Sequence, residues 1–161
     1  MPIRLRPAVC AVVIITVIIV SGCISTKVTE VAQQQPPAVF VDYHRTGGTF
    51  GTDDRLVIFD NGIAAISSRS SSTELGLNLS EMDRISALLG KAQFEQLQSN
   101  YPAPHADSRL MNYSITYHRK IVTVQDTAIP PGLQPVIDEL NLIITNAISQ
   151  KNAFPSVSVN T

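Results

Sequence analysis

Apolar and polar residues alternate in short runs along the first half of the chain, and this pattern predicts β-strands. Such runs cover Ala38–Arg45, Arg55–Phe59 and Ile63–Ser68, and a weaker one covers Leu75–Leu79. Asp60-Asn61-Gly62 separates the second run from the third. Asn-Gly between β-branched residues is typical of a type I′ hairpin turn, in which both central residues have positive φ. We therefore expect three or four strands here, including one tight hairpin.

Two later segments have apolar residues at helical spacing. Ser80 begins the first, and Asp83 lies three positions later in a variant of the capping box, which binds free N–H groups of the first turn. The apolar positions of this helix are Met82, Ile85, Leu88, Leu89 and Ala92. It is expected to break or bend near Gly90-Lys91. The second helix runs from about Leu133 to Ile148, with Pro135 in the first turn, where a missing N–H does no harm.

Between the two helices the chain is expected to form a second hairpin. Met111–His118 alternates strictly between apolar and polar residues, a turn follows at Arg119-Lys120, and Ile121–Gln125 returns. Ser99–Arg109 contains two prolines and is expected to be an irregular loop. The order of elements predicts an α+β domain with a mainly antiparallel sheet of about five or six strands and two helices packed on one face.

The start of the chain has the features of an export signal. Two basic residues, Arg4 and Arg6, precede an apolar run over residues 8–20, which is shorter than the roughly 20 residues of a membrane-spanning helix. Val20-Ser21-Gly22-Cys23 then resembles the lipobox of prokaryotic lipoproteins. This resemblance implies that Cys23 becomes the lipid-bearing first residue of the mature protein. The alternative is an uncleaved membrane anchor, which would leave the domain on the same side of the membrane.

These features predict a simple organisation. It consists of a signal peptide over residues 1–22, a flexible tether over 23–37, one α+β domain over 38–148 and a disordered tail over 149–161. Because both cysteines precede the domain, no disulfide can hold it together. Removal of the signal leaves 10 basic against 13 acidic residues, a net charge of −3, so nucleic acid is not an expected partner. We expect an exported protein, anchored by lipid at a cell membrane or envelope, with its domain outside the cytoplasm.

The sequence contains none of the common catalytic signatures, such as His-Glu-x-x-His, Gly-x-Ser-x-Gly or a P-loop. We therefore expect no enzymatic activity, no metal and no cofactor. His44 and His118 are expected to be exposed strand residues. His105 lies near Asp107, but two candidate ligands do not make a metal site. An enzyme with a metal bound by His105 is the least favoured alternative.

A glycine-rich segment, Thr46–Gly51, joins the first two predicted strands. It does not match a phosphate-binding loop, because no Gly-Lys-Ser/Thr follows and no helix begins there. Two interpretations stay open. Its three glycines, Gly47, Gly48 and Gly51, supply the unusual φ values of a hairpin loop, or they leave a projecting loop whose backbone can approach a partner closely.

The same region carries a resemblance to a known family. Tyr43-x-Arg45-Thr46-Gly47-Gly48, followed by Gly51 and an apolar strand, resembles the emfourin-like domains, which are inhibitors of the protealysin and thermolysin type of metalloprotease. Further short motifs occur in the family's order across most of residues 41–144. They are Leu79-Ser80, Phe94-x-x-Leu97, Asp107, Tyr113-x-Ile115 and Pro130–Leu140.

The resemblance implies a small α+β domain whose loop enters or covers the active-site cleft of a metalloprotease. The partner-binding residues would be Arg45, Thr46, Gly47, Gly48, Thr49, Phe50 and Gly51, with Arg45 and Phe50 framing the loop. Inhibition would be steric. The alternative is a non-inhibitory interaction or structural module of the cell envelope, in which the same loop binds another protein.

Overall fold

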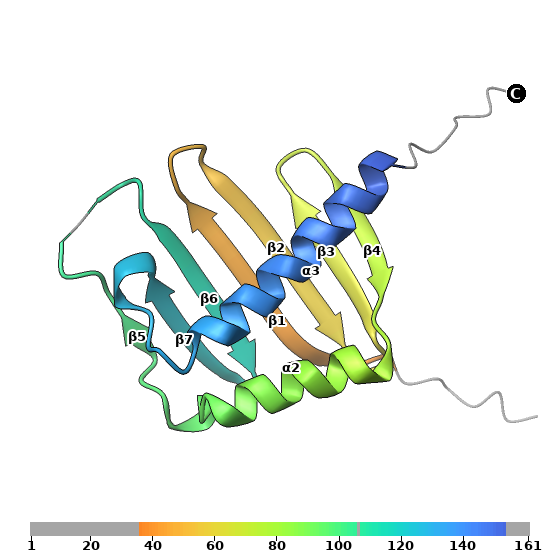
Figure 1. The fold of residues 1–161 in the computed structure, drawn as a ribbon, viewed down its shortest axis with the longest axis horizontal. Coiled ribbons are helices and arrows are strands. Elements are labelled where there is room, and N and C mark those ends of the chain that lie inside the picture. The colour runs from red at the N-terminus through yellow and green to blue at the C-terminus, as the bar shows by residue number, and fades with distance from the viewer. Residues whose placement is uncertain (1–35, 106, 154–161) are drawn as a thin grey trace, which may run out of the picture. The chain divides into compact units, whose positions relative to one another are not determined.

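A computed structural model describes residues 36–105 and 107–153, which Figure 1 shows as a coloured ribbon. The predicted signal peptide, Cys23, most of the predicted tether and the last eight residues lie outside the described residues. The strands are β1 (Val39–Gly47), β2 (Thr52–Phe59), β3 (Ile63–Ser68), β4 (Ser72–Gly76), β5 (Asn100–Tyr101), β6 (Met111–Tyr117) and β7 (Lys120–Gln125). The helices are α2 (Leu79–Lys91) and α3 (Gln134–Ala153), with the short 3-10 helices η1 (Phe94–Gln96) and η2 (Asp126–Ala128).

The strands form one seven-stranded sheet in the order β4-β3-β2-β1-β6-β7-β5. Every neighbouring pair is antiparallel except β5 and β7. The predicted α+β class with a mainly antiparallel sheet is thus confirmed, but the expected strand number is wrong. The missed strand is β5, which lies inside the segment that was expected to be an irregular loop. It is only two residues long and is followed by Pro102, so it has no alternating pattern to detect.

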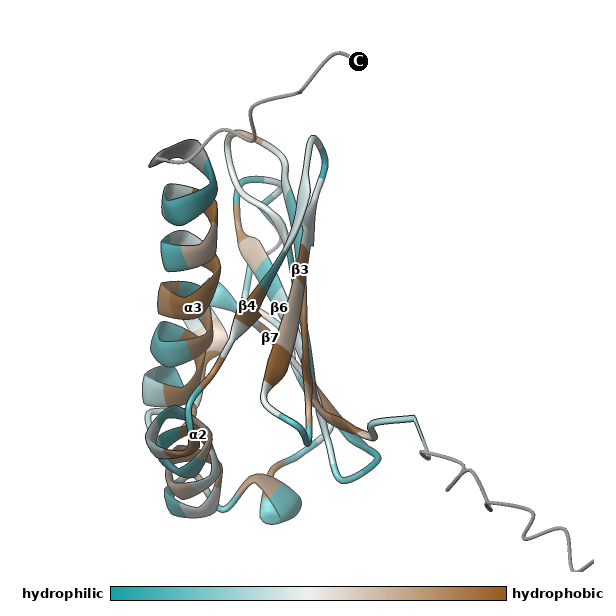
Figure 2. Ribbon diagram, turned by 90° about the vertical axis from the view of Figure 1, so that its right-hand side faces the viewer, coloured by the Kyte–Doolittle hydropathy of each residue, from teal (hydrophilic) through white to brown (hydrophobic). Residues whose placement is uncertain are grey.

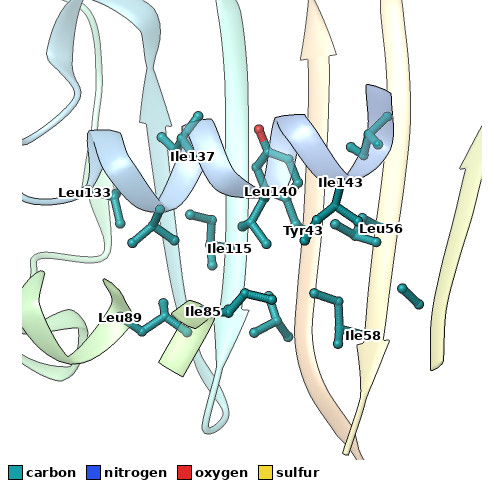
Figure 3. Packing of buried hydrophobic residues seen from close by; sticks show 14 of the residues in the cluster. Tyr43, Leu56, Ile58, Ile85, Leu89, Ile115, Leu133, Ile137, Leu140 and Ile143 are labelled. Carbon is teal, nitrogen blue, oxygen red and sulfur yellow. The ribbon is translucent and has the colours of Figure 1, made fainter. Parts of the chain in front are cut away.

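One face of the sheet carries the hydrophobic core. Alternate residues of the central strand, Val41 and Tyr43, are fully buried there, as are Leu56 of β2 and Ile115 of β6. Figure 2 shows α2 and α3 on the same side of the sheet, and Figure 3 shows their apolar side chains facing the strands. The buried helix residues are Ile85, Leu89, Val136, Ile137, Leu140, Ile143, Ile144 and Ala147. The opposite face of the sheet is mostly polar.

Both hairpins form, with turns that differ from the expected ones. In the loop between β2 and β3 only Gly62 has positive φ (82°), and its N–H donates to the Phe59 carbonyl (3.0 Å). This is a three-residue loop with a left-handed third residue, and the type I′ prediction for Asn61-Gly62 is wrong. In the β6–β7 turn, His118 and Arg119 have φ of 46° and 68°. That turn lies one residue earlier than expected, and His118 belongs to it instead of to a strand face.

The helix boundaries also differ from the prediction. Asn78 caps α2, because its side chain accepts from the Glu81 N–H (3.0 Å) and the Glu81 carboxylate accepts from the Asn78 N–H (2.7 Å). The capping box is therefore real, but it lies two residues before the expected one at Ser80. α2 ends at Lys91, close to the expected break. α3 continues to Ala153, so residues 149–153 are helical instead of part of a disordered tail.

Candidate protein-binding loop

The loop between β1 and β2 is shorter than the sequence indicated. The ladder between the two strands continues through the pairs Thr46–Asp53 and Gly47–Thr52. Thr46 and Gly47 of the predicted loop therefore belong to β1, as Arg45 was expected to, and only Gly48–Gly51 connects the strands. The Gly51 N–H donates to the Gly48 carbonyl (3.0 Å), which closes the connection as a tight turn.

The glycines at the base of this loop are required by conformation and by packing. Gly47 has a φ of 103°, and a Cβ there would lie 2.4 Å from the Leu110 carbonyl oxygen. Gly48 has a φ of 71°, and its N–H donates to that same carbonyl (3.2 Å). Gly51 also has positive φ, at 62°. The interpretation in which the glycines supply unusual φ values is confirmed, and the base of the loop is fixed against the segment that leads into β6.

The loop carries one strongly exposed aromatic side chain, Phe50. It is 95% exposed, more than any other large hydrophobic residue in the part of the chain that the structure describes. An aromatic ring held in water on a tight turn makes no contact that would stabilise the fold. Buried aromatic side chains are the commonest energetic centres of protein interfaces. Its position therefore suits it to contact a partner.

Arg45 does not frame the loop, contrary to the sequence-based expectation. Its side chain turns to the helix side of the sheet, where Nε donates to Asp54 Oδ2 (2.9 Å) and Nη1 donates to Asn141 Oδ1 of α3 (2.8 Å). The Tyr43 hydroxyl donates to the same Asn141 oxygen (2.9 Å). Asp54 is only 8% exposed. The network links the loop-side ends of β1 and β2 to α3.

Two tyrosines continue this network across the sheet. The rings of Tyr43 and Tyr113 stack with their centroids 6.3 Å apart, and the Tyr113 hydroxyl donates to Asp126 Oδ1 (2.8 Å). Burial raises the pKa of Tyr43 well above its usual range. Burial and then the hydrogen bond to Asp126 raise the pKa of Tyr113. Both hydroxyls therefore stay protonated at physiological pH and act as hydrogen-bond donors.

A hollow of about 420 Å³ lies beside the loop. Its walls come from the loop itself, from the β3–β4 turn and from the end of α3, and they include Phe50, Arg69, Ile148 and Lys151. The Arg69 guanidinium lies over Gly51, 3.1 Å from where a Cβ would stand. The loop, the turn and the end of α3 thus form one surface at this end of the domain.

Two of the three histidines each lie beside a single carboxylate. His44 Nε2 lies 2.8 Å from Asp53 Oδ1 on the polar face of the sheet, within β1. His118 stacks on Tyr117, with Nδ1 3.3 Å from Glu95 Oε1. Within residues 36–105 and 107–153, no group of three or more His, Cys, Asp or Glu side chains is placed to hold a metal ion.

The carboxylate proposed as a partner of His105 is engaged elsewhere. Asp107 accepts hydrogen bonds from the Arg109 side chain, at 2.7 and 3.0 Å, and from its N–H, at 2.8 Å. The side-chain bonds and then the backbone bond from Arg109 lower the pKa of Asp107 to about 2. In this structure the Asp107 carboxylate is thus paired with Arg109.

The fold and this surface define a small α+β domain with a rigid loop that presents one exposed aromatic ring. No protein-family model matches the chain, and no curated protein matches it. None of the helices in the described ranges has the length and apolar character needed to cross a membrane. The loop stays a sequence-based candidate for partner binding. The sequence carried no signal for Asn141, whose side-chain Oδ1 accepts from Arg45, 96 residues away in the chain.

Proposed function

We propose that this domain binds a protein partner through the Gly48–Gly51 loop, with Phe50 entering an apolar depression of the partner. The observation that carries the proposal is the 95% exposure of Phe50 on a loop whose base is fixed. Transfer of a phenylalanine side chain from water to an apolar site contributes about 2–3 kcal/mol. A single anchor of this size can dominate the binding energy of an interface.

The rigidity of the loop strengthens this proposal. Binding orders flexible segments at a cost of about 0.5–1.5 kcal/mol for each immobilised side chain. Here the Gly48 N–H is already bound to Leu110, the Gly51 N–H to Gly48, and the strands beneath to Asn141. The backbone of the loop is thus pre-organised, so little backbone ordering opposes the burial of Phe50.

The candidate partner is a metalloprotease of the thermolysin type, for which the resemblance to emfourin-like domains is the support. Inhibition would occur by occlusion of the active-site cleft. The geometry of the tip suits an inhibitor, because the hydrogen bond from Gly51 N–H to Gly48 holds the tip in a turn. A protease cleaves an extended segment, so a peptide bond inside this turn is a poor substrate. The domain itself catalyses nothing in this proposal.

We further propose that the protein is exported and held at the membrane by lipid on Cys23. The support is the lipobox-like sequence and the short apolar run before it. Mass spectrometry of the mature protein tests this, since a lipidated Cys23 gives an N-terminal peptide with added diacylglycerol. An N-terminal peptide that begins at Met1 would show instead an uncleaved anchor.

The binding proposal is tested by titrating the mature protein, with Cys23→Ser to keep it soluble, into thermolysin and following peptide hydrolysis. Phe50→Ala is expected to weaken inhibition by about 30-fold or more, which corresponds to the 2–3 kcal/mol of the lost anchor. Leu79→Ala is the matched control, because Leu79 is also strongly exposed (84%) but lies at the other end of the domain. It should inhibit like the unsubstituted protein.

The outcomes separate the two candidate functions. Inhibition that Phe50→Ala leaves unchanged excludes the loop as the inhibitory surface. No inhibition of thermolysin, or of several other proteases of its type, by the unsubstituted protein favours a non-inhibitory module of the cell envelope. Cross-linking in envelope preparations then becomes the assay, and a partner captured by the unsubstituted protein but not by Phe50→Ala keeps the loop as the binding surface.

A further inference from the structure

Four of the six exposed large hydrophobic side chains in the described residues lie toward the end of the domain opposite Phe50. Val39 (55% exposed), Ile63 (41%) and Leu79 (84%) lie nearest that end, and we call them the base residues. Val39 pairs with Phe59 and Ile63 pairs with Gly76, so the strand register puts both at this end. The fourth, Ile121 (53%), follows the β6–β7 turn and pairs with Thr116. Leu79 begins α2 three residues after Gly76. Figure 1 shows this end at the bottom, where β1 and β3 start and β4 leads into α2.

The chain also enters the domain at this end. The described residues begin at Pro36, three residues before Val39. Cys23 lies 13 residues before Pro36 in the sequence. The sequence predicts a flexible tether here, and a tether of that length would have a root-mean-square span of roughly 20 Å. A lipid on Cys23 would therefore keep the base residues close to the membrane surface. Phe50 lies beyond the far end of β1, roughly 25–30 Å away at the rise of an extended strand.

We propose that the base residues contact the surface of the lipid bilayer and orient the domain so that Phe50 points away from the membrane. This inference rests on the proposed lipidation of Cys23. Three apolar side chains are too few to bind a free protein firmly to a membrane. Tethering changes this, because a short flexible linker gives an effective concentration in the millimolar range, at which a weak contact is well populated.

Charged side chains of both signs lie at this end of the domain. Asp60 accepts from the Ala38 N–H (3.1 Å), and Glu81 caps the Asn78 N–H (2.7 Å), so both carboxylates lie near the base residues. The β6–β7 turn adds Arg119 and Lys120 at the same end, because Val41 pairs with Tyr117, the last residue of β6. Since the charges are mixed, the proposed contact rests on the apolar side chains.

The chain contains no tryptophan, so a single introduced tryptophan reports its own environment. The experiment uses the full lipidated protein in vesicles of phosphatidylethanolamine and phosphatidylglycerol, with Leu79→Trp and Phe50→Trp as a matched pair. Both positions are more than four-fifths exposed, so both proteins should fold normally, and circular dichroism checks this. Brominated phospholipids in the vesicles quench a tryptophan that touches the bilayer.

We expect a blue-shifted emission and quenching by brominated lipid for Leu79→Trp, with neither effect for Phe50→Trp. An anchored Leu79→Trp protein that shows no quenching overturns the proposed contact. Quenching of Phe50→Trp alone overturns it as well, since the domain would then face the membrane with its loop. Flotation with the vesicles reports anchoring separately. A protein that does not float lacks the anchor, and the proposed contact fails with it, whereas protease inhibition is measured on the soluble form and is unaffected.

Discussion

Arg45 and Asp54 are direct register partners on β1 and β2, and their side chains also form an ion pair on the helix side of the sheet. Arg45 Nε and Nη2 lie 2.9 and 2.8 Å from Asp54 Oδ2. The side chains are 20% and 12% exposed, so this pair is largely withdrawn from water. A neighbouring pair, Arg55–Asp42, lies on the polar face, where the Arg55 side chain is 56% exposed. The two pairs offer a direct comparison.

Arg45→Met should lower the free energy of unfolding by about 2–4 kcal/mol, because it leaves the Asp54 carboxylate buried without its cation. Arg55→Met should lower it by less than about 1 kcal/mol, because solvent screens the exposed pair. Urea denaturation followed by circular dichroism measures both. Equal small losses in the two proteins would show that the Arg45 network contributes little to stability.

Gly47→Ala and Gly90→Ala should change stability in opposite directions. The added Cβ at Gly47 would lie 2.4 Å from the Leu110 carbonyl oxygen and would require a φ of 103°, so we expect a loss of about 2 kcal/mol or more. Gly90 lies in α2 with no atom within 4 Å of the added Cβ, and alanine there should add about 0.5–1 kcal/mol. Thermal unfolding of both variants measures these changes. A Gly47→Ala protein as stable as the unsubstituted one would contradict the close packing of Gly47 against Leu110.

Alkaline pH should destabilise the domain through Tyr43. Burial raises the pKa of this hydroxyl above its ordinary value of 10.0, so the folded state keeps a proton that the unfolded state loses. The stabilising effect is therefore complete below pH 10 and declines as the pH rises above it. Tyr43→Phe should lose about 1 kcal/mol at neutral pH, since one hydrogen bond is removed, and should depend less on pH above 10. Urea denaturation at several pH values tests this.

The Tyr113 hydroxyl should contribute to the same loss of stability at alkaline pH. Its pKa is also raised, first by burial, so Tyr43→Phe should retain part of the alkaline sensitivity. Tyr43→Phe combined with Tyr113→Phe should lose more of it. An unsubstituted protein whose free energy of unfolding stays constant above pH 10 would contradict the raised pKa of both hydroxyls.

The sequence predicted best those strands and helices in which the spacing of apolar residues reflects one buried side. Strictly alternating segments such as Met111–Tyr117 and helical ones such as Leu133–Ile148 have one buried side, and their patterns identify them directly. β5 was missed because it has only two residues, too few to show an alternating pattern, and its pairing with β7 is not visible in the sequence. The α2 cap was placed two residues late, because Asn78-x-x-Glu81 and Ser80-x-x-Asp83 are equally good local patterns, and the choice depends on where β4 ends.

The candidate site was predictable only in part. The glycines and the aromatic residue mark the loop in the sequence, but the extent of the loop depends on how far the β1–β2 ladder continues. Arg45 was expected to face a partner, whereas the buried Asp54 and the distant Asn141 draw it to the helix side. No local pattern encodes that contact, because its three residues come from β1, β2 and α3.

The position of β1 has a mechanical consequence. This strand starts three residues after the first described residue, lies between β2 and β6, and ends at the loop that carries Phe50. A force applied between the N-terminal side of the domain and a partner on the loop therefore runs along one strand. The covalent backbone of β1 carries that load from one end of the domain to the other, while the ladders to β2 and β6 hold the strand extended. The helices and the edge strands would carry almost none of that load, so the domain could transmit tension from its N-terminal end to its loop without unfolding from its margins.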